Sequence, residues 1–312
     1  MAFSFVSFVS FVSKLCKLSS AAVLSLALWA PAGAAEFEFA AFGDTPYTRE
    51  EEARIPDFIA ELNRQRLAFV VHIGDFKSAN MPCSDDAFRQ RLEWFELSRH
   101  PFVYVPGDNE WTDCRRFSAG RHDPRERLQK LRALFFRGDE SLGQRRLALT
   151  RQSPGRPEHA RWRQDRVLFA TLNVPGGANN ARDDPEEFRG RNEAVLAWLR
   201  DAFRIARAES LPALVLLLHA NPWASPSSRH FGYRDLLIAL DAETREFRGQ
   251  VLLVHGDTHR YRADRPAIHP DGIAPPSNFT RVEVFGYPTM NWVRIRVVED
   301  AGRIRFEAAP GS

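Results

Sequence analysis

The most restrictive feature of the sequence is a regular alternation of short apolar runs with longer amphipathic segments. Six apolar runs have the length of β-strands: residues 37–44, 67–75, 101–110, 167–174, 211–220 and 251–257. Five segments between them place apolar side chains at helical spacing: residues 49–66, 86–98, 124–136, 185–206 and 233–247. Strands that alternate with helices indicate right-handed crossovers and mostly parallel sheet, so the sequence predicts an α/β fold.

The last part of the chain has a different pattern. Residues 281–286, 291–299 and 303–308 read as strands with no helix between them. We expect them to be antiparallel and to form a second sheet packed against the first. No stretch rich in Gly, Ser or Pro separates two halves, so residues 35–312 are expected to form one domain.

Residues 1–34 have the order of segments found in a cleavable signal peptide. Lys14 and Lys17 give the beginning a positive charge, and a short apolar run follows at residues 21–30. The Ala-Gly-Ala sequence at 32–34 matches a small-residue cleavage site. Because a membrane-spanning helix needs about 20 apolar residues, the run is too short to cross a bilayer. We expect a periplasmic or secreted protein without a retained membrane anchor; a retained anchor is the alternative.

Charge argues against a nucleic-acid partner. The chain has 43 Lys and Arg against 40 Asp and Glu. Lys14 and Lys17 lie in the predicted leader, so the remainder is nearly neutral. Its arginines are scattered among acidic residues, which is typical of solvated helix faces and not of a nucleic-acid groove.

Cys83 and Cys114 are the cysteines outside the predicted leader. Both follow short acidic motifs in segments expected to lie side by side. Since exported proteins fold in oxidising compartments, the pair predicts a disulfide. Two free structural thiols are the alternative.

Polar residues end five of the predicted strands. They are four aspartates and two histidines: Asp44, Asp75, Asp108, His219, Asp257 and His259. A glycine precedes each aspartate, and we expect it to permit the sharp turn that aims the next side chain. Loops at the carboxyl ends of strands converge on one crevice, so these side chains are expected to lie together.

Four carboxylates at one place repel one another unless a counter-charge is present. A divalent cation supplies that charge, and a histidine nitrogen is a common co-ligand. Any one Asp after Gly is an ordinary turn residue, but five strand ends of the same character favour a site for one or two divalent metal ions.

The motifs resemble those of the calcineurin-like metallophosphoesterases. The series is GD at 43–44, GD at 74–75, GDNE at 107–110, a single His219 and GDTH at 256–259. It covers nearly all of residues 35–312 in the family's order. More narrowly, GDTPY, HIGDFK, VPGDNEWTDC and VHGDTH are similar to an exported branch of that superfamily. The resemblance implies a four-layer α-β-β-α sandwich, in which two mixed sheets are flanked by helices.

The resemblance also implies a site with two metal ions. Asp44 and His259 would hold one ion, and Asp75 would bridge both. The second ion would be held by Asp108, His219 and Asp257, although the family has Asn where this chain has Asp108 and His where it has Asp257.

Two further family histidines are replaced. Pro46 stands where the first motif has a His ligand, and Asn109 stands where a His is thought to assist the leaving group or position phosphate. The site is therefore richer in carboxylate, which favours Mn²⁺, Mg²⁺ or Ca²⁺ over Zn²⁺ or iron. Asn109 could hydrogen-bond a phosphate oxygen but cannot act as an acid.

His255 and Lys77 are the candidates to replace the missing acid. His255 also fits a buried histidine at a strand end, and Lys77 also fits a partner for the excess carboxylates. In the loop at 173–180, Asn179 and Asn180 are either substrate contacts or ordinary turn residues.

The implied activity is hydrolysis of a phosphomonoester or phosphodiester by a metal-bridging hydroxide, with a small phosphorylated substrate. Two alternatives remain open. One is a metal-stabilised binding protein that lacks catalysis, which Pro46 and Asn109 favour. The other is a metal-dependent hydrolase of a non-phosphate ester.

Overall fold

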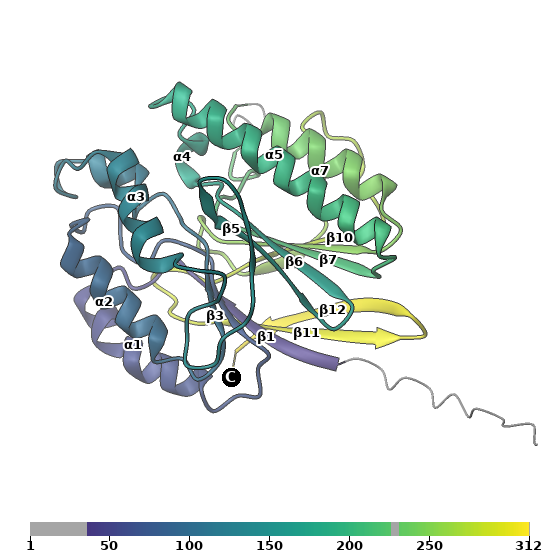
Figure 1. The fold of residues 1–312 in the computed structure, drawn as a ribbon, viewed down its shortest axis with the longest axis horizontal. Coiled ribbons are helices and arrows are strands. Elements are labelled where there is room, and N and C mark those ends of the chain that lie inside the picture. The colour runs from purple at the N-terminus through teal and green to yellow at the C-terminus, as the bar shows by residue number, and fades with distance from the viewer. Residues whose placement is uncertain (1–35, 226–230, 312) are drawn as a thin grey trace, which may run out of the picture. The chain divides into compact units, whose positions relative to one another are not determined.

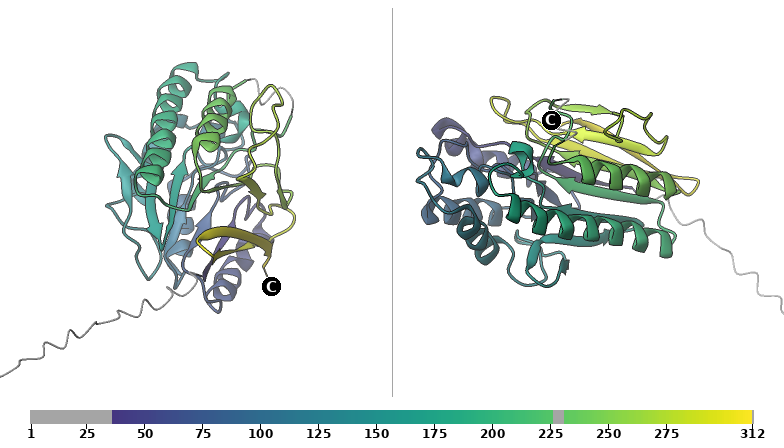
Figure 2. Two further views of the ribbon diagram at one scale, coloured as in Figure 1. Left: turned by 90° about the vertical axis from the view of Figure 1, so that its right-hand side faces the viewer. Right: turned by 90° about the horizontal axis from the view of Figure 1, so that it is seen from above.

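A computed structural model describes residues 36–225 and 231–311. The predicted signal peptide at 1–34 lies outside these residues. The strands form two sheets, and helices cover the outer face of each (Figures 1 and 2). The predicted α/β sandwich of two mixed sheets is therefore confirmed.

The smaller sheet has five strands in the order β12-β11-β1-β2-β3. Their bounds are β1 Glu36–Phe42, β2 Val70–His72, β3 Phe102–Tyr104, β11 Val293–Asp300 and β12 Arg303–Pro310. β1, β2 and β3 are parallel, whereas β11 is antiparallel to both β1 and β12. The first and last strands of the chain therefore share a sheet, and three carboxyl ends lie side by side at one edge.

The larger sheet has seven strands in the order β4-β5-β6-β7-β8-β10-β9. Their bounds are β4 Thr150–Gln152, β5 Arg156–Gln164, β6 Val167–Leu172, β7 Ala213–Leu218, β8 Gln250–His255, β9 Arg262–Asp264 and β10 Phe279–Glu283. β6, β7, β8 and β10 are parallel, β5 and β9 are antiparallel to their neighbours β6 and β10, and β4 is antiparallel to β5.

β11 and β12 are antiparallel as expected, but the three C-terminal strands do not form a sheet of their own. β11 and β12 extend the sheet that begins with β1, and β10 pairs in parallel with β8. The apolar alternation of these segments identified them as strands. It carried no information on their neighbours, because pairing is decided by contacts far apart in the chain.

Helices α1 to α3 lie on the five-stranded sheet, and α5 and α7 lie on the seven-stranded sheet (Figure 1). Their bounds are α1 Arg49–Leu62, α2 Asp85–Glu96, α3 Pro124–Phe135, α5 Pro185–Ala208 and α7 Arg234–Glu246. Side-chain caps fix several starts: Thr48 accepts from the backbone N–H of Glu51, and Asp184 accepts from that of Glu187. No helix in the described parts of the chain is both long enough and apolar enough to cross a membrane.

Apolar side chains fill all three spaces between the four layers. The space between the two sheets contains an aromatic cluster. Phe69 lies 5.0 Å from Phe169 and 5.3 Å from Trp162, measured between ring centroids. This packing joins the sheets, so it fixes the strand ends of one sheet relative to those of the other.

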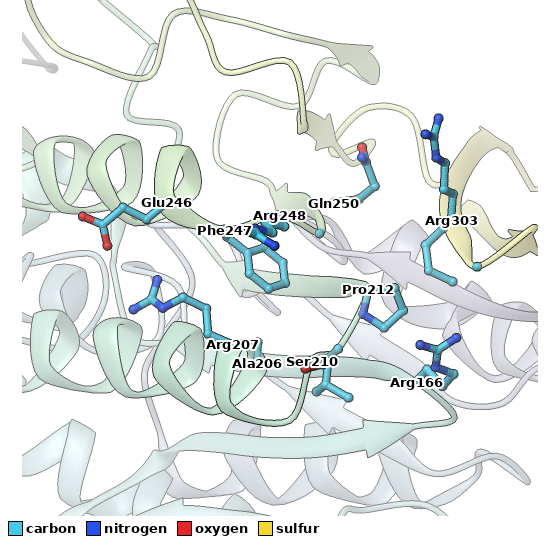
Figure 3. A pocket seen from close by; sticks show the side chains of 14 residues that line it. Arg166, Ala206, Arg207, Ser210, Pro212, Glu246, Phe247, Arg248, Gln250 and Arg303 are labelled. Atoms are coloured by element: carbon cyan, nitrogen blue, oxygen red, sulfur yellow. The ribbon is translucent and has the colours of Figure 1, made fainter.

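The two ends of the sheets differ in chemistry. At the amino ends of β7 and β8 lies a cavity of about 550 Å³ lined by Arg166, Arg207, Arg248 and Arg303 (Figure 3). Two of these arginines pair with acids, Arg207 with Glu243 and Arg166 with Glu299. Three of the predicted metal-ligating residues, His219, Asp257 and His259, follow the opposite, carboxyl ends of these two strands.

The predicted disulfide between Cys83 and Cys114 is present in the structure. It connects the loop before α2 to the short helix η1 at Thr112–Arg115, which follows the Asp108 loop. The disulfide closes a loop between cysteines 31 residues apart and so restricts the unfolded chain. Reduction removes this restriction and should therefore destabilise the fold. The expected loss of unfolding free energy is about 3.5 kcal/mol from loop-closure entropy.

Urea titrations with and without dithiothreitol measure that loss. A C83S/C114S double variant is the control, since its stability should equal that of the reduced wild type and should not respond to the reductant. Equal stability of oxidised and reduced wild type would contradict the prediction.

His159 predicts a pH dependence of stability. Its side chain is fully buried, and burial lowers the pKa of its ring to about 4. The unfolded ring has a pKa near 6.5, so between pH 6.5 and pH 4 the unfolded state binds the proton. Stability should fall as pH decreases through that window, with His159 contributing about 1.4 kcal/mol per pH unit.

Urea unfolding at several pH values between 7 and 4.5 measures the slope. His159→Gln keeps a polar side chain next to Gln152, the present hydrogen-bond partner, but cannot titrate. Its slope should be shallower than that of the wild type. An unchanged slope would show that His159 does not carry the effect.

Candidate metal centre

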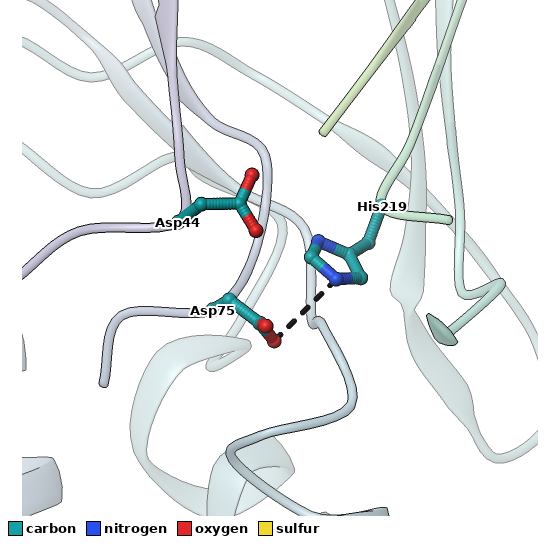
Figure 4. A group of neighbouring side chains, drawn as sticks. All are labelled: Asp44, Asp75 and His219. Carbon is teal, nitrogen blue, oxygen red and sulfur yellow. Dashed lines mark ion pairs between the residues drawn. The ribbon is translucent and has the colours of Figure 1, made fainter. Parts of the chain in front are cut away.

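The packed sheets bring all six predicted ligand side chains to one edge. Asp44, Asp75 and Asp108 follow β1, β2 and β3, while His219 follows β7 and Asp257 and His259 follow β8. Two groups have potential ligand atoms within 4.8 Å of one another. They are Asp44, Asp75 and His219 (Figure 4), and Asp108, His219 and Asp257.

His219 is the side chain that the two groups share. Its Nδ1 lies 2.8 Å from the carbonyl oxygen of Ile73. A carbonyl oxygen only accepts, so Nδ1 carries the hydrogen and the neutral ring has a lone pair on Nε2. This buried Nε2 faces Asp108 Oδ1 at 3.0 Å and Asp75 Oδ1 at 3.5 Å. Three electron-rich atoms therefore converge, and only a proton or a cation between them makes the arrangement favourable.

His259 is oriented in the same way. Its Nδ1 lies 2.8 Å from the carbonyl oxygen of Tyr287, which leaves Nε2 directed at Asp44 Oδ1, 3.4 Å away. A backbone carbonyl behind each imidazole is the usual arrangement behind a metal-binding histidine. This donor set fits divalent metal ions.

Electrostatics lead to the same conclusion. Burial raises the pKa of Asp75 well above its usual range, and the Asp108 carboxylate adds to the effect. Burial likewise raises the pKa of Asp257 to about 7. For His219 burial lowers the pKa, but the surrounding carboxylates outweigh it and the pKa is raised well above its usual value. Without a cation the cluster must hold extra protons, and a divalent ion can take their place.

Backbone N–H groups from neighbouring loops orient the four carboxylates. Each aspartate accepts one such bond from a loop other than its own. The pairs are Asn109 to Asp75 at 2.9 Å, Asp257 to Asp44 at 3.0 Å, Asn221 to Asp257 at 2.8 Å and Gly176 to Asp108 at 3.0 Å. One oxygen of each carboxylate is thereby fixed, so the direction of the other is also fixed.

Glu110 ties two of these loops together. Its buried Oε1 accepts from the backbone N–H of Asp75 at 3.0 Å, from that of Gly107 at 2.6 Å and from the Tyr104 hydroxyl at 2.7 Å. The carboxylate therefore holds the loops after β2 and β3 in one arrangement.

The glycines before the aspartates act differently from the sequence-based expectation. Gly74 has a positive φ of 87°, but the other three have ordinary φ values and are needed for space. A Cβ on Gly107 would lie 2.1 Å from Asp75 Oδ1, and one on Gly256 would lie 2.4 Å from Asp44 Oδ2. The sharp turn is made by the aspartates themselves, since Asp44, Asp75 and Asp257 have φ between 53° and 78°.

The predicted catalytic residues lie at this edge but are engaged with protein groups. The Asn109 side chain donates to the Tyr47 hydroxyl at 2.9 Å. His255 is fully buried, its Nδ1 lies 2.9 Å from the Gly256 carbonyl oxygen, and its Nε2 has no hydrogen-bond partner in the described part of the chain. Their catalytic roles stay predictions.

Lys77 does not pair directly with the carboxylates. Its buried ammonium donates to the carbonyl of Ser78 at 3.0 Å and forms no ion pair within residues 36–225 and 231–311. Burial lowers the pKa of Lys77 to about 8, while Glu110 and Asp75 oppose the shift. Its charge thus acts on the cluster from a distance.

Tyr47 is a site residue that the sequence reasoning missed. Its hydroxyl donates to Asp75 Oδ2 at 2.9 Å and lies 3.5 Å from Asp44 Oδ1. The sequence feature that points to Tyr47 is its position in the GDTPY motif, immediately after Pro46. A hydroxyl group therefore reaches the cluster from the loop in which the family has an imidazole.

The loop after β6 contains a left-handed turn beside Asp108. Gly177, Ala178, Asn179 and Asn180 all have φ between 56° and 59°. The left-handed conformation costs an L-residue roughly 1 kcal/mol or more, and several consecutive residues in this conformation are rare. Asn179 and Asn180 are both buried and their side chains bond protein groups, which supports the turn-residue interpretation over substrate contact.

No protein-family model matches the sequence, and no curated protein matches it. Solved structures do resemble the fold. A dimetal phosphatase from Danio rerio is 12% identical with a TM-score of 0.51, and the match covers 88% of this chain and 98% of that chain. PhoD is 10% identical with a TM-score of 0.53, covering 89% of this chain and 68% of that chain.

A purple acid phosphatase from seeds of yellow lupin (Lupinus luteus) is 13% identical with a TM-score of 0.50. The match covers 88% of this chain and 51% of the lupin enzyme, so this chain spans about half the length of that protein. At these identities the likeness is one of fold. Together with the two mixed sheets and the order of polar strand ends, it shows that this chain has the calcineurin-like metallophosphoesterase fold.

Proposed function

We propose that this protein is a phosphoesterase that binds two divalent metal ions and hydrolyses a small phosphorylated substrate. The observation that carries the proposal is the convergence of buried carboxylates on the lone-pair nitrogen of His219. The structural neighbours named as phosphatases have the same fold and support the reaction class.

Two divalent ions bound here would activate water and neutralise the negative charge of a phosphoryl group. The chain's own residues would hold and orient them. Asp44 and His259 would hold one ion, Asp75 would bridge, and Asp108, His219 and Asp257 would hold the other. Because oxygen ligands dominate, Mn²⁺, Mg²⁺ or Ca²⁺ is favoured, with Zn²⁺ or iron as the less favoured ions.

We propose that Asn109 and Tyr47, whose side chains lie beside Asp75, contact the substrate. The Asn109 amide donates to the Tyr47 hydroxyl, and that hydroxyl donates to Asp75. Either group could turn toward a phosphoryl oxygen and donate a hydrogen bond to it. Neither is a strong acid, so substrates with good leaving groups should react best.

The same hydrogen bonds favour one alternative, a metal-stabilised binding protein without catalysis. The side chains of Asn109, Tyr47 and Asp75 already satisfy one another. Turnover therefore distinguishes the two functions, whereas metal binding alone does not.

The direct test is metal content together with turnover. We expect two ions per chain and hydrolysis of p-nitrophenyl phosphate or its bis ester with Mn²⁺, Mg²⁺ or Ca²⁺. The better substrate separates a monoesterase from a diesterase. Asp75→Asn should lose most of its metal and at least about 100-fold in turnover, because a proposed bridging ligand is lost.

Asp57→Asn is the matched control. Asp57 is an exposed aspartate on α1, so the same substitution there should change neither metal content nor turnover. Two ions with no turnover under any metal would support the binding protein instead. Full metal load and turnover in Asp75→Asn would exclude the assignment of Asp75.

We also propose that the chain is exported to the periplasm or outside the cell. The leader pattern at 1–34 supports this, as does the disulfide, which is typical of oxidising compartments. Expression in a bacterium, followed by N-terminal sequencing of the protein in the periplasm and medium, should find a chain that begins at residue 35. Recovery of only the uncleaved chain from the cytoplasm would contradict the proposal.

A further inference from the structure

The left-handed turn at residues 177–180 is held by one side chain in particular. Asn179 uses every polar group it has. Its amide Nδ2 donates to the Gly232 carbonyl at 2.8 Å, and its backbone N–H donates to the Tyr233 hydroxyl at 3.1 Å. Its Oδ1 and its backbone carbonyl accept from the Arg191 guanidinium at 2.6 and 2.9 Å.

The partners of Asn179 are themselves fixed. Arg191 is fully buried in helix α5, where Glu187 neutralises it and the Asn173 carbonyl accepts a further bond. Its guanidinium also lies 5.4 Å from the ring centroid of Trp111, in the loop that carries Asp108. The Tyr233 hydroxyl donates to the Pro175 carbonyl, so both ends of the turn are tied.

Gly176, the residue immediately before the turn, contacts one half of the metal centre. The Gly176 N–H donates to Asp108 Oδ1 at 3.0 Å, the same oxygen that faces His219 Nε2. A Cβ on Gly176 would lie 2.4 Å from Asp108 Oδ1 and 2.8 Å from Asp257 Oδ1. The backbone thus lies against both carboxylates of the second group.

In the described parts of the chain, the other half receives no hydrogen bond from residues 176–180, and its supports come from the Asp108 loop, the Asp257 loop and Tyr287. Asp75 is bonded by the Asn109 N–H, and the His259 ring is bonded by the Tyr287 carbonyl. Loss of the turn should therefore affect the two halves unequally.

We propose that Asn179 is a positioning residue which, with Arg191 and Tyr233, fixes the Asp108–Asp257 half of the centre through this turn. The inference rests on the two-ion centre of the proposed function. It assigns control of one ion to side chains that touch neither ion nor substrate.

The test is calorimetric titration of the metal-free protein with Mn²⁺, with electron paramagnetic resonance to count free Mn²⁺. Asn179→Ala should bind one ion with wild-type affinity and the other 10- to 100-fold more weakly, the usual effect of removing support behind a ligand. Tyr233→Phe removes only the hydroxyl and keeps the buried ring. It should shift the same ion in the same direction, and it serves if Asn179→Ala does not fold.

Asn278→Ala is the matched control. The Asn278 amide also holds a loop through backbone carbonyls, those of Thr244, Phe247 and Gly249. That loop precedes β8, at the end of the strand opposite the metal centre, and lines the cavity in Figure 3. This variant should lose thermal stability but bind both ions as the wild type does.

If both variants bound both ions with wild-type affinity, the inference would be overturned. The same holds if both ions were weakened to the same extent. A wild-type protein that binds fewer than two ions would overturn the two-ion centre itself. The two failures are distinguishable because the ion count of the wild type tests the two-ion centre, whereas the affinities of the variants test the role of Asn179. Neither measurement depends on turnover.

Discussion

The mutual repulsion of buried carboxylates is the constraint on which the rest of this structure depends. Asp44 and Asp75 form one close pair, and Asp108 and Asp257 form another, with oxygens within 4.8 Å. Two such charges repel by roughly 4 kcal/mol at an effective dielectric constant near 20. The backbone N–H bonds that cross between loops offset part of this cost, and the packing of the two sheets prevents the loops from separating.

Much of the fold could be predicted from the sequence because burial and chain direction are local properties. Apolar runs such as 211–220 and 251–257 became β7 and β8, and their polar ends met because parallel strands place carboxyl ends at one edge. The partners of β10 and β11 could not be predicted in this way. Nor could β5, since Arg156–Gln164 is polar at many positions and obtains its burial from neighbours.

The residues of the candidate site also divide into those that a local sequence pattern identifies and those that depend on tertiary contacts. Asp44, Asp75, Asp108, His219, Asp257 and His259 could be identified because each ends a strand. Tyr47 could not, since its hydroxyl reaches Asp75 only through the path of its loop. The sequence predicts a turn at each glycine, which holds for Gly74. The close approach of Gly107 to Asp75 is a tertiary contact, and sequence alone does not distinguish it from a turn.

The bond between the Asp257 N–H and Asp44 Oδ2 joins residues 213 positions apart. During synthesis, Asp44 leaves the ribosome long before the loop that orients it exists. Neither half of the centre can be complete until β8 has been made and has docked beside β7. In the proposed two-ion centre, metal binding would therefore follow the synthesis of β8, and a truncated product would carry exposed aspartates without the geometry to hold an ion.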